Sequence, residues 1–497
     1  MSNLKSLAKD TAIYGMSSIL GKFLNYLLVP LYTATFSAES GGYGVITNIY
    51  ALIALLQVLL IYGMETGFFR FANKQGENEN TVYSSILITV GSTSLLFVFL
   101  SLVFLGPISS GLGYADHPEY LGIMATVVAM DAFQSIPFAY LRHRKRPIKF
   151  AAIKLFSIVF GILLNLFFFL LCPWLHMHHP ETISWFYDSA YGVGYVFVAN
   201  FITTFIQMFF FIPELRGFSY TYDRELMKRI FRYSFPLMIL GLVGILNQTV
   251  DKILFPFLYP DENMAKVQLG IYGATTKIAM VMAMFTQAFR FAYEPFVFSK
   301  SKDGDQRAVY ARVMKFFVIF ALLAFLTVMF YLDILRYIIA PDYWEGLNVV
   351  PVVMGAELFM GIYFNLSFWY KLIDETRWGA YFSFIGCIVI VGLNVVFVPL
   401  YGYWACAWAG LGGYAVITVF SYAVGQKKYP IDYDLKGIGA YMLLALALYG
   451  ISVWVVPSNT ILRLLFRTVL LFIFVGYTVK KDLPLNQIPL LNRLIKK

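Results

Sequence analysis

Long apolar runs, separated by short polar segments, fill this sequence from residue 11 to residue 479. Most runs contain about 20 or more residues with few charges, which is the length that a helix needs to cross the hydrocarbon core of a bilayer. The breaks fall mainly at glycine, proline or clusters of charge, as expected for loops. We predict about 14 transmembrane helices. Their ranges are 11–36, 43–69, 82–108, 119–141, 148–172, 188–213, 230–257, 269–298, 310–335, 347–373, 378–399, 403–425, 437–457 and 460–479.

The composition excludes a soluble fold. Hydrophobic residues make up 59% of the 497 residues and charged residues only 13%, whereas a soluble domain has about 25% charged residues. A soluble protein of this size could not bury so much apolar side chain. The alternating strands of an outer-membrane barrel are absent. The sequence therefore predicts an all-α polytopic membrane protein without an appended soluble domain.

The charges of the loops predict the orientation. Basic residues gather in the N-terminus, in the loops after even-numbered spans and in the C-terminus, and the opposite loops are mainly acidic. By the positive-inside rule, both termini are cytoplasmic. Arg463 and Arg467, near the outer end of the last span, are exceptions that can snorkel to the outer head groups or line a groove. The net charge of +10 thus reflects orientation, and we expect membrane lipids rather than nucleic acid as partners.

A short motif occurs twice. Tyr43-Gly44-x-x-Thr47-x-Ile49 opens the second predicted span, and Tyr272-Gly273-x-x-Thr276-x-Ile278 opens the eighth. An even number of spans separates the two copies, so the halves would share one orientation, as in transporters built from parallel repeats. We therefore predict two six-helix lobes in a pseudo-twofold repeat, residues 1–213 and 214–429, followed by two additional spans and a cytoplasmic tail in residues 430–497.

Charged side chains also lie inside the predicted spans, where they are costly and usually face a cavity or a partner. Basic groups outnumber acidic ones. A basic, partly hydrated path favours an anionic substrate, with phosphate the obvious candidate. The acids could instead bind a coupling cation or hold the lysines apart. The basic residues are Lys22, Arg70, Lys154, Lys252, Lys277 and Arg290, and the acids are Glu65, Asp131, Asp251, Glu294 and Glu357.

A purely structural role is the alternative for these charges. Arg290 and Glu294 are one helical turn apart and could pair. Asp251 and Lys252 are sequence neighbours that point in different directions, so each is expected to need a partner elsewhere. Charged side chains near the ends of spans can snorkel to the interface.

No catalytic constellation competes with transport. A Walker loop is absent, and the three cysteines form no CxxC pair. His176-Met177-His178-His179 could bind a metal, but we favour a solvated outer loop that ends at Pro180. We expect no enzymatic activity, no cofactor and no metal site.

The order of several short motifs resembles the polysaccharide transporters of the MOP superfamily, the Wzx-type lipid-linked oligosaccharide flippases of bacteria. The resemblance covers about the whole chain. Trp404 and Cys406 depart from the usual Gly-Ala-Ala pattern of the family. The motifs are Gly42-Tyr43-Gly44, Asp251-Lys252, Gly270-Ile271-Tyr272, Glu294-Pro295-Phe296, Leu393-Asn394, Pro399-Leu400 and Tyr401-Gly402, then small residues between Ala405 and Gly413.

The resemblance implies a secondary transporter of the bacterial cytoplasmic (inner) membrane. Two lobes would alternate access and move an undecaprenyl-pyrophosphate-linked oligosaccharide to the outer leaflet for surface polysaccharide synthesis. Membrane potential or a gradient, of protons or sodium ions, would drive it. By position, the substrate-binding residues would be Lys22, Arg70, Lys252, Lys277 and Arg290, with Lys154 added from its place in a span. The ion-coupling candidates are Glu65, Asp251 and Glu357.

Two alternatives remain. A MATE-like cation-coupled drug antiporter shares the architecture, but a cavity for cationic drugs should favour acids in its spans. A polytopic polysaccharide polymerase or ligase should carry a large outer loop with catalytic residues. The longest outer loop here, about 172–188, is short and contains no arginine.

Overall fold

The computed structural model describes residues 20, 23, 24, 26–217, 219–299 and 306–482, and within them every regular element is a helix. Twelve helical segments of the described chain are long and apolar enough to cross a membrane. They correspond to the second to fifth and the seventh to fourteenth predicted spans. The first predicted span lies mainly outside the described residues, and the sixth corresponds to Gly194–Phe209, of 16 residues. The all-α polytopic class is confirmed, and the count of 14 stays a prediction.

The described chain forms two compact units. The first comprises residues up to Ala274 together with Cys387–Cys406, and the second comprises Thr275–Gly386 and the residues from Ala407 onward. Helices α14, α19 and α20 contribute to both. The predicted lobe boundaries at residues 213 and 429 stay a prediction.

The helices before α14 all belong to the first unit. They are α2 (Leu28–Thr35), α3 (Gly42–Ile61), α4 (Met64–Ala72), α5 (Glu79–Val103), α6 (Leu105–Gly111), α7 (Pro118–His143), α8 (Pro147–Leu166), α9 (Cys172–His178), α10 (Pro180–Ile183), α11 (Gly194–Phe209), α12 (Ile212–Leu215) and α13 (Arg224–Leu258), with short turns η1 (Ala38–Ser40), η2 (Phe167–Leu171) and η3 (Ser189–Tyr191). Then follow α14 (Glu262–Ser299), α15 (Gln306–Phe330), α16 (Leu332–Leu335), η4 (Arg336–Ile338), η5 (Pro341–Val349), α17 (Val350–Leu366), α18 (Phe368–Leu372), α19 (Arg377–Tyr401), α20 (Tyr403–Lys428), α21 (Leu435–Trp454) and α22 (Thr460–Lys481).

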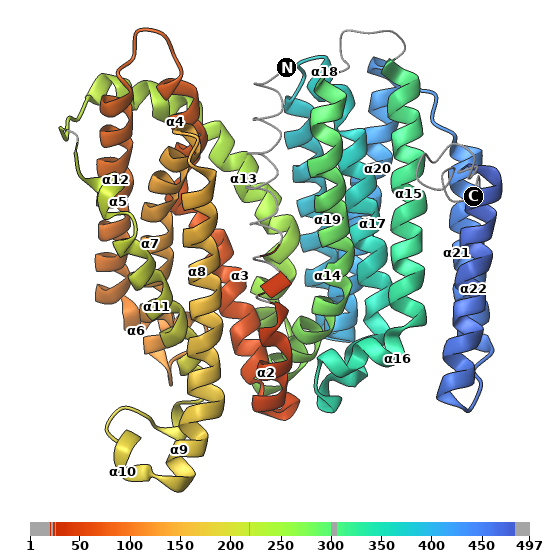
Figure 1. Cartoon of the computed structure of the whole chain (residues 1–497), viewed down its shortest axis with the longest axis horizontal. Coiled ribbons are helices and arrows are strands. Elements are labelled where there is room, and N and C mark those ends of the chain that lie inside the picture. The colour runs from red at the N-terminus through yellow and green to blue at the C-terminus, as the bar shows by residue number, and fades with distance from the viewer. Residues whose placement is uncertain (1–19, 21–22, 25, 218, 300–305, 483–497) are drawn as a thin grey trace, which may run out of the picture. The chain divides into compact units, whose positions relative to one another are not determined.

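In the first unit, α5, α7, α8 and α11 run side by side, and α13 packs along α3 and α4 (Figure 1). Local sequence sets the helix ends. The side chain of Asn78 accepts hydrogen bonds from the backbone amides that open α5, and Asp223 does the same for α13. The core at one end is aromatic: Phe68 and Tyr83 are buried, and the rings of Tyr83 and Tyr140 stack 4.3 Å apart.

The predicted span 43–69 is broken into α3 and α4. Tyr62 and Gly63 both adopt the left-handed conformation, with φ of 34° and 73°. At Gly63 and Gly67 the chain passes so close to Ser234 of α13 that a side chain would collide with it. A glycine at the bend therefore serves both the turn and the close approach of α13.

The two copies of the repeated motif lie against each other in the first unit. Gly41 and Gly44 of the first copy approach Lys266 and Gly270, and Gly273 approaches Thr47. The residue numbers rise together along both helices, so α3 and the start of α14 run parallel, which is the direction that the repeat predicts. A methyl group at Gly44 would overlap the Lys266 carbonyl oxygen. Glycine is thus required for this helix contact.

In the second unit, α21 and α22 are fastened to α15 and α16 at both ends. Lys315 of α15 pairs with Asp482 and with Asp434, 2.8 Å away. The hydrogen bond from Lys315 holds the pKa of Asp434 below its ordinary value. At the other end, Arg463 and Arg467 lie 2.7 and 2.8 Å from the Asp333 carboxylate. The two exceptional arginines of the last span therefore share the Asp333 carboxylate, which offsets one of their two positive charges.

The glycine contact predicts a position-specific stability effect. We expect Gly44→Ala to destabilise the protein by about 1–3 kcal/mol, because the overlap with Lys266 forces the helices apart. Gly450→Ala is the matched control, since nothing lies within 4 Å of a Cβ at that position of α21. The control should be neutral or stabilising by up to about 1 kcal/mol. The measurement is the thermal midpoint in detergent, and equal midpoints for both variants would contradict the contact.

Candidate functional site

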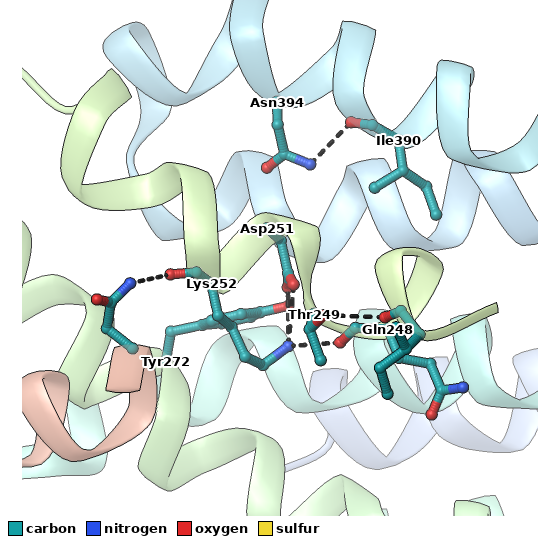
Figure 2. Close-up of polar contacts among 9 residues, drawn as sticks. Gln248, Thr249, Asp251, Lys252, Tyr272, Ile390 and Asn394 are labelled. Carbon is teal, nitrogen blue, oxygen red and sulfur yellow. Dashed lines mark hydrogen bonds and ion pairs between the residues drawn. The ribbon is translucent and has the colours of Figure 1, made fainter. Parts of the chain in front are cut away.

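Asp251 and Lys252 form the centre of a polar cluster in α13 of the first unit. Asp251 is buried, and the Lys252 ammonium lies 3.1 and 3.0 Å from its two carboxylate oxygens (Figure 2). Lys252 also donates to the Gln248 carbonyl oxygen at 3.2 Å. The expectation that neighbouring residues could not pair is wrong for Lys252, because its flexible four-carbon stem lets the ammonium fold back onto the preceding carboxylate.

Two residues from the repeated motifs hold this pair. The Tyr272 hydroxyl donates to Asp251 at 2.9 Å, and its ring lies 5.3 Å from the Lys252 ammonium. Asn48 donates to the Lys252 carbonyl oxygen at 2.8 Å and accepts a hydrogen bond from Tyr114, also at 2.8 Å. Sequence reasoning identified Asp251 and Lys252 but missed Asn48 and Tyr114. Asn48 could have been suspected from its place inside the first motif.

A second polar feature of this region is the buried side-chain amide of Asn394 in α19. The residue is fully buried, and its amide nitrogen donates to the Ile390 carbonyl oxygen at 2.8 Å (Figure 2). Within the described part of the chain, nothing donates to its side-chain oxygen. Cys406, also buried, lies within electrostatic range of both Asp251 and Lys252. An oxygen without a donor in an apolar interior is available to a cation or to water.

Arg70 and Lys154 are positioned by aromatic rings. The Arg70 guanidinium lies 4.1 Å from the ring centre of Tyr233, and the Lys154 ammonium lies 4.2 Å from that of Phe138. In the described residues, neither forms an ion pair within hydrogen-bonding distance of a carboxylate, although Lys154 interacts electrostatically with Asp131. An aromatic face orients a cation without cancelling its charge.

Glu65, by contrast, has a basic partner. It forms an ion pair with Arg142 at the end of α7, and both side chains are about one-third exposed. Other residues of the basic segment 142–146 also pair with acids: Arg144 with Glu79, and Arg146 with Glu214, which Lys149 of α8 also contacts. Much of the basic loop 142–146 is thus engaged in holding helix ends together.

The remaining predicted residues lie elsewhere. Lys277, Arg290 and Glu357 are partly exposed residues of the second unit, and the Arg290 guanidinium lies 4.3 Å from the ring centre of Phe364. Lys22 lies outside the described residues. The structure thus brings Asp251 and Lys252 together in the first unit.

The histidine cluster does not converge. The His178 Nδ1 donates to the Trp174 carbonyl oxygen at 2.8 Å and its ring stacks on that of Trp174, while the His176 ring contacts that of Tyr187. No group of three His, Cys, Asp or Glu residues in the described chain could hold a metal ion.

A match to a known protein family identifies the family of this chain. The sequence profile of a family described as polysaccharide biosynthesis protein matches residues 7–292, more than half of the chain. The chain belongs to this family. No curated protein sequence matches it significantly.

Solved structures show that this polysaccharide biosynthesis protein has the MOP fold. An inward closed form of the lipid II flippase MurJ is similar over 94% of this chain and 98% of its own, with a TM-score of 0.73 and 15% identity. An inward-facing multidrug resistance MATE transporter of the MOP superfamily is similar over 81% of this chain and 93% of its own, with a TM-score of 0.62 and 13% identity. The resemblance to MOP flippases is confirmed, and family and fold are those of multi-pass membrane transporters and flippases.

The hydrogen bond between Tyr272 and Asp251 predicts non-additive stability effects in this polysaccharide biosynthesis protein. Tyr272→Phe should destabilise by about 1 kcal/mol, because it removes a donor to a carboxylate. In a protein that already carries Asp251→Asn, Tyr272→Phe should lower the free energy of unfolding by a measurably smaller amount. Tyr259→Phe is the control, since the Tyr259 hydroxyl meets Gln268 instead and should be additive with Asp251→Asn. Thermal midpoints of the variants test this, and full additivity for Tyr272 would refute the coupling.

Proposed function

We propose that this protein flips an undecaprenyl-pyrophosphate-linked oligosaccharide from the inner to the outer leaflet of the bacterial cytoplasmic membrane, by alternating access and with both termini in the cytoplasm. The observation that carries the proposal is the excess of basic over acidic residues inside the spans. Membership in a polysaccharide biosynthesis family and the fold shared with a lipid II flippase support it. Pyrophosphate is the group on such a substrate that basic residues bind best.

The setting of Arg70 and Lys154 supports an anionic substrate. Each cation lies on an aromatic ring instead of in an ion pair within the described chain. An aromatic ring does not cancel the positive charge, so each cation can still attract a phosphate group, although Lys154 also interacts electrostatically with Asp131. Lys22, Lys252, Lys277 and Arg290 complete the proposed substrate-binding set, and their convergence on one cavity is part of the proposal.

Among the ion-coupling candidates, Asp251 is the one that we favour. Its carboxylate is buried and has only Lys252 and Tyr272 as hydrogen-bonded partners among the described residues. A proton or a sodium ion that neutralises Asp251 would release the Lys252 ammonium, whose folded-back position depends on that carboxylate. Glu65 is already paired with Arg142, and both Glu65 and Glu357 stay predictions.

A drug antiporter is the second candidate, because the MATE fold also matches. The two functions predict different losses when the gene is deleted. A flippase deletion should accumulate a lipid-linked oligosaccharide on the cytoplasmic face of the membrane, as measured by lipid extraction and by accessibility of the glycan in oriented vesicles. Unchanged lipids with new sensitivity to cationic drugs would instead identify an antiporter.

The basic residues predict separate loss-of-function variants. Lys22→Ala, Arg70→Ala and Arg290→Ala should each lower export of the surface glycan by about tenfold or more, because each removes a charge-assisted contact with phosphate. Protein levels in the membrane should stay normal. Lys145→Ala removes an equal charge from an exposed loop position and should export normally. Normal export by the three span variants would contradict the substrate-binding assignment.

A further inference from the structure

One exposed apolar stripe runs along α8, η2 and α9. From Phe156 onward its members recur every three or four residues, and Ile148 lies about two turns before Phe156, so they follow one helix face. Each is at least 37% exposed within the protein, and the two ends of the stripe, Ile148 and Met177, reach 77% and 74%. A stripe of this kind on a transmembrane helix is the face that meets lipid. Its residues are Ile148, Phe156, Val159, Leu163, Leu166, Leu170, Trp174 and Met177.

The length of this stripe indicates how far across a bilayer its end at Met177 can reach. From Ile148 to Met177 the helix rises about 44 Å, which equals the thickness of a bilayer including both head-group regions, about 40–45 Å. Ile148 directly follows the basic segment 142–146, which belongs at a head-group level itself. A helix of this length that lies along the bilayer normal would carry Met177 to the head-group level of the opposite leaflet. The stripe does not stop at the hydrocarbon boundary and continues into α9.

Residues 172–188, called here the finger, form an ordered projection beyond the end of α8 (Figure 1). Cys172, Ile183 and Tyr187 are buried inside it. The Tyr187 ring stacks 5.0 Å from that of Tyr195 in α11, and the Tyr195 hydroxyl accepts the Asp188 backbone amide at 2.7 Å. These contacts fix the finger on the helical bundle.

The outer side of the finger is aromatic and almost uncharged. Trp185 is 82% exposed and Trp174 is 49% exposed. The Trp185 ring nitrogen already donates to the Thr182 carbonyl oxygen at 3.1 Å, so the exposed part is chiefly the apolar ring. The finger contains no lysine or arginine, and Glu181 and Asp188 are its only acids.

We propose that the finger is an interfacial membrane anchor, whose Trp174, Met177 and Trp185 side chains insert into the head-group region of the leaflet opposite the basic segment 142–146. Continuity with the lipid-facing stripe identifies the occupant as lipid. Tryptophan is enriched at this level because its ring is amphipathic. Insertion depends on aromatic and apolar area, so it requires neither anionic lipid nor low salt. The loop predicted to be solvated is thus a membrane contact.

Depth measurement by electron paramagnetic resonance tests the anchor. A background with Cys172→Ala, Cys387→Ala and Cys406→Ala receives a nitroxide at Met177→Cys or Trp185→Cys, and the protein is reconstituted into phosphatidylcholine vesicles. For each label, the measured quantity is the ratio of its accessibility to oxygen over its accessibility to a water-soluble nickel complex. We expect this ratio to be several-fold higher at Met177→Cys and Trp185→Cys than at Glu181→Cys on the same finger. Leu163→Cys gives the reference for hydrocarbon. The ratios should not change with salt or with added phosphatidylglycerol.

Two outcomes would overturn the proposal. Labels at Met177 and Trp185 with the nickel accessibility of the Glu181 label would mean a solvated finger. Labels shielded from both oxygen and nickel, with spectra that sharpen on dilution in lipid, would mean contact with a second copy of the chain.

A second measurement avoids the cysteine-free background. Trp174→Phe/Trp185→Phe keeps aromatic packing, and the fluorescence lost relative to wild type reports the two finger rings among the eight tryptophans. The fluorescence of these two rings should be quenched strongly by lipids brominated close to the head group and only weakly by aqueous iodide. Quenching by iodide alone would also refute the anchor.

Discussion

A charge inside a bilayer is stable only when another charge, a polar group or water compensates for it. This constraint divides the basic residues of the described chain into two classes. Lys252 forms an ion pair with Asp251, and Arg463 and Arg467 share Asp333, so carboxylates offset much of their charge. Arg70 and Lys154 lie on aromatic rings and keep a positive field. Ion pairs thus hold helices in place, whereas the second class has the property that binding of an anion needs.

Backbone proximity is the second constraint. The α3–α14 contact exists because glycine occurs at Gly44, Gly270 and Gly273, where larger side chains would separate the helices. Parallel helices from two copies of one motif can pack so closely only if both copies have the same orientation in the membrane. The packing therefore gives part of the short sequence repeat a physical role, since Gly44, Thr47 and Gly273 of the motifs take part in the contact.

The sequence predicted the fold class well because hydrophobicity and length determine a transmembrane helix almost alone. Breaks inside spans were harder: the kink at Tyr62 and Gly63 depends on the approach of Ser234, which is distant in sequence. The site was predicted by residue type but not by pairing. Asp251 and Lys252 were both identified, yet their mutual ion pair depends on the side-chain conformation of Lys252, and the role of Asn48 depends on the packing of α3 against α13. The periodicity of the sequence indicates neither the conformation of one side chain nor the packing of α3 against α13.

The Asp251–Lys252 pair and the glycine contact are structurally connected. Asn48 is one turn from Gly44 and bonds the backbone of Lys252, while Tyr272 adjoins Gly273 and bonds the Asp251 carboxylate. A change in the charge on Asp251 acts directly on the hydrogen bond from Tyr272 in the second motif copy, whereas Asn48 of the first copy bonds the adjacent backbone carbonyl of Lys252. These residues lie beside the glycines at which the helices touch, so the buried carboxylate and the contact between α3 and α14 are joined by two hydrogen bonds and a few residues of backbone. An ion-driven change of helix packing requires this kind of link.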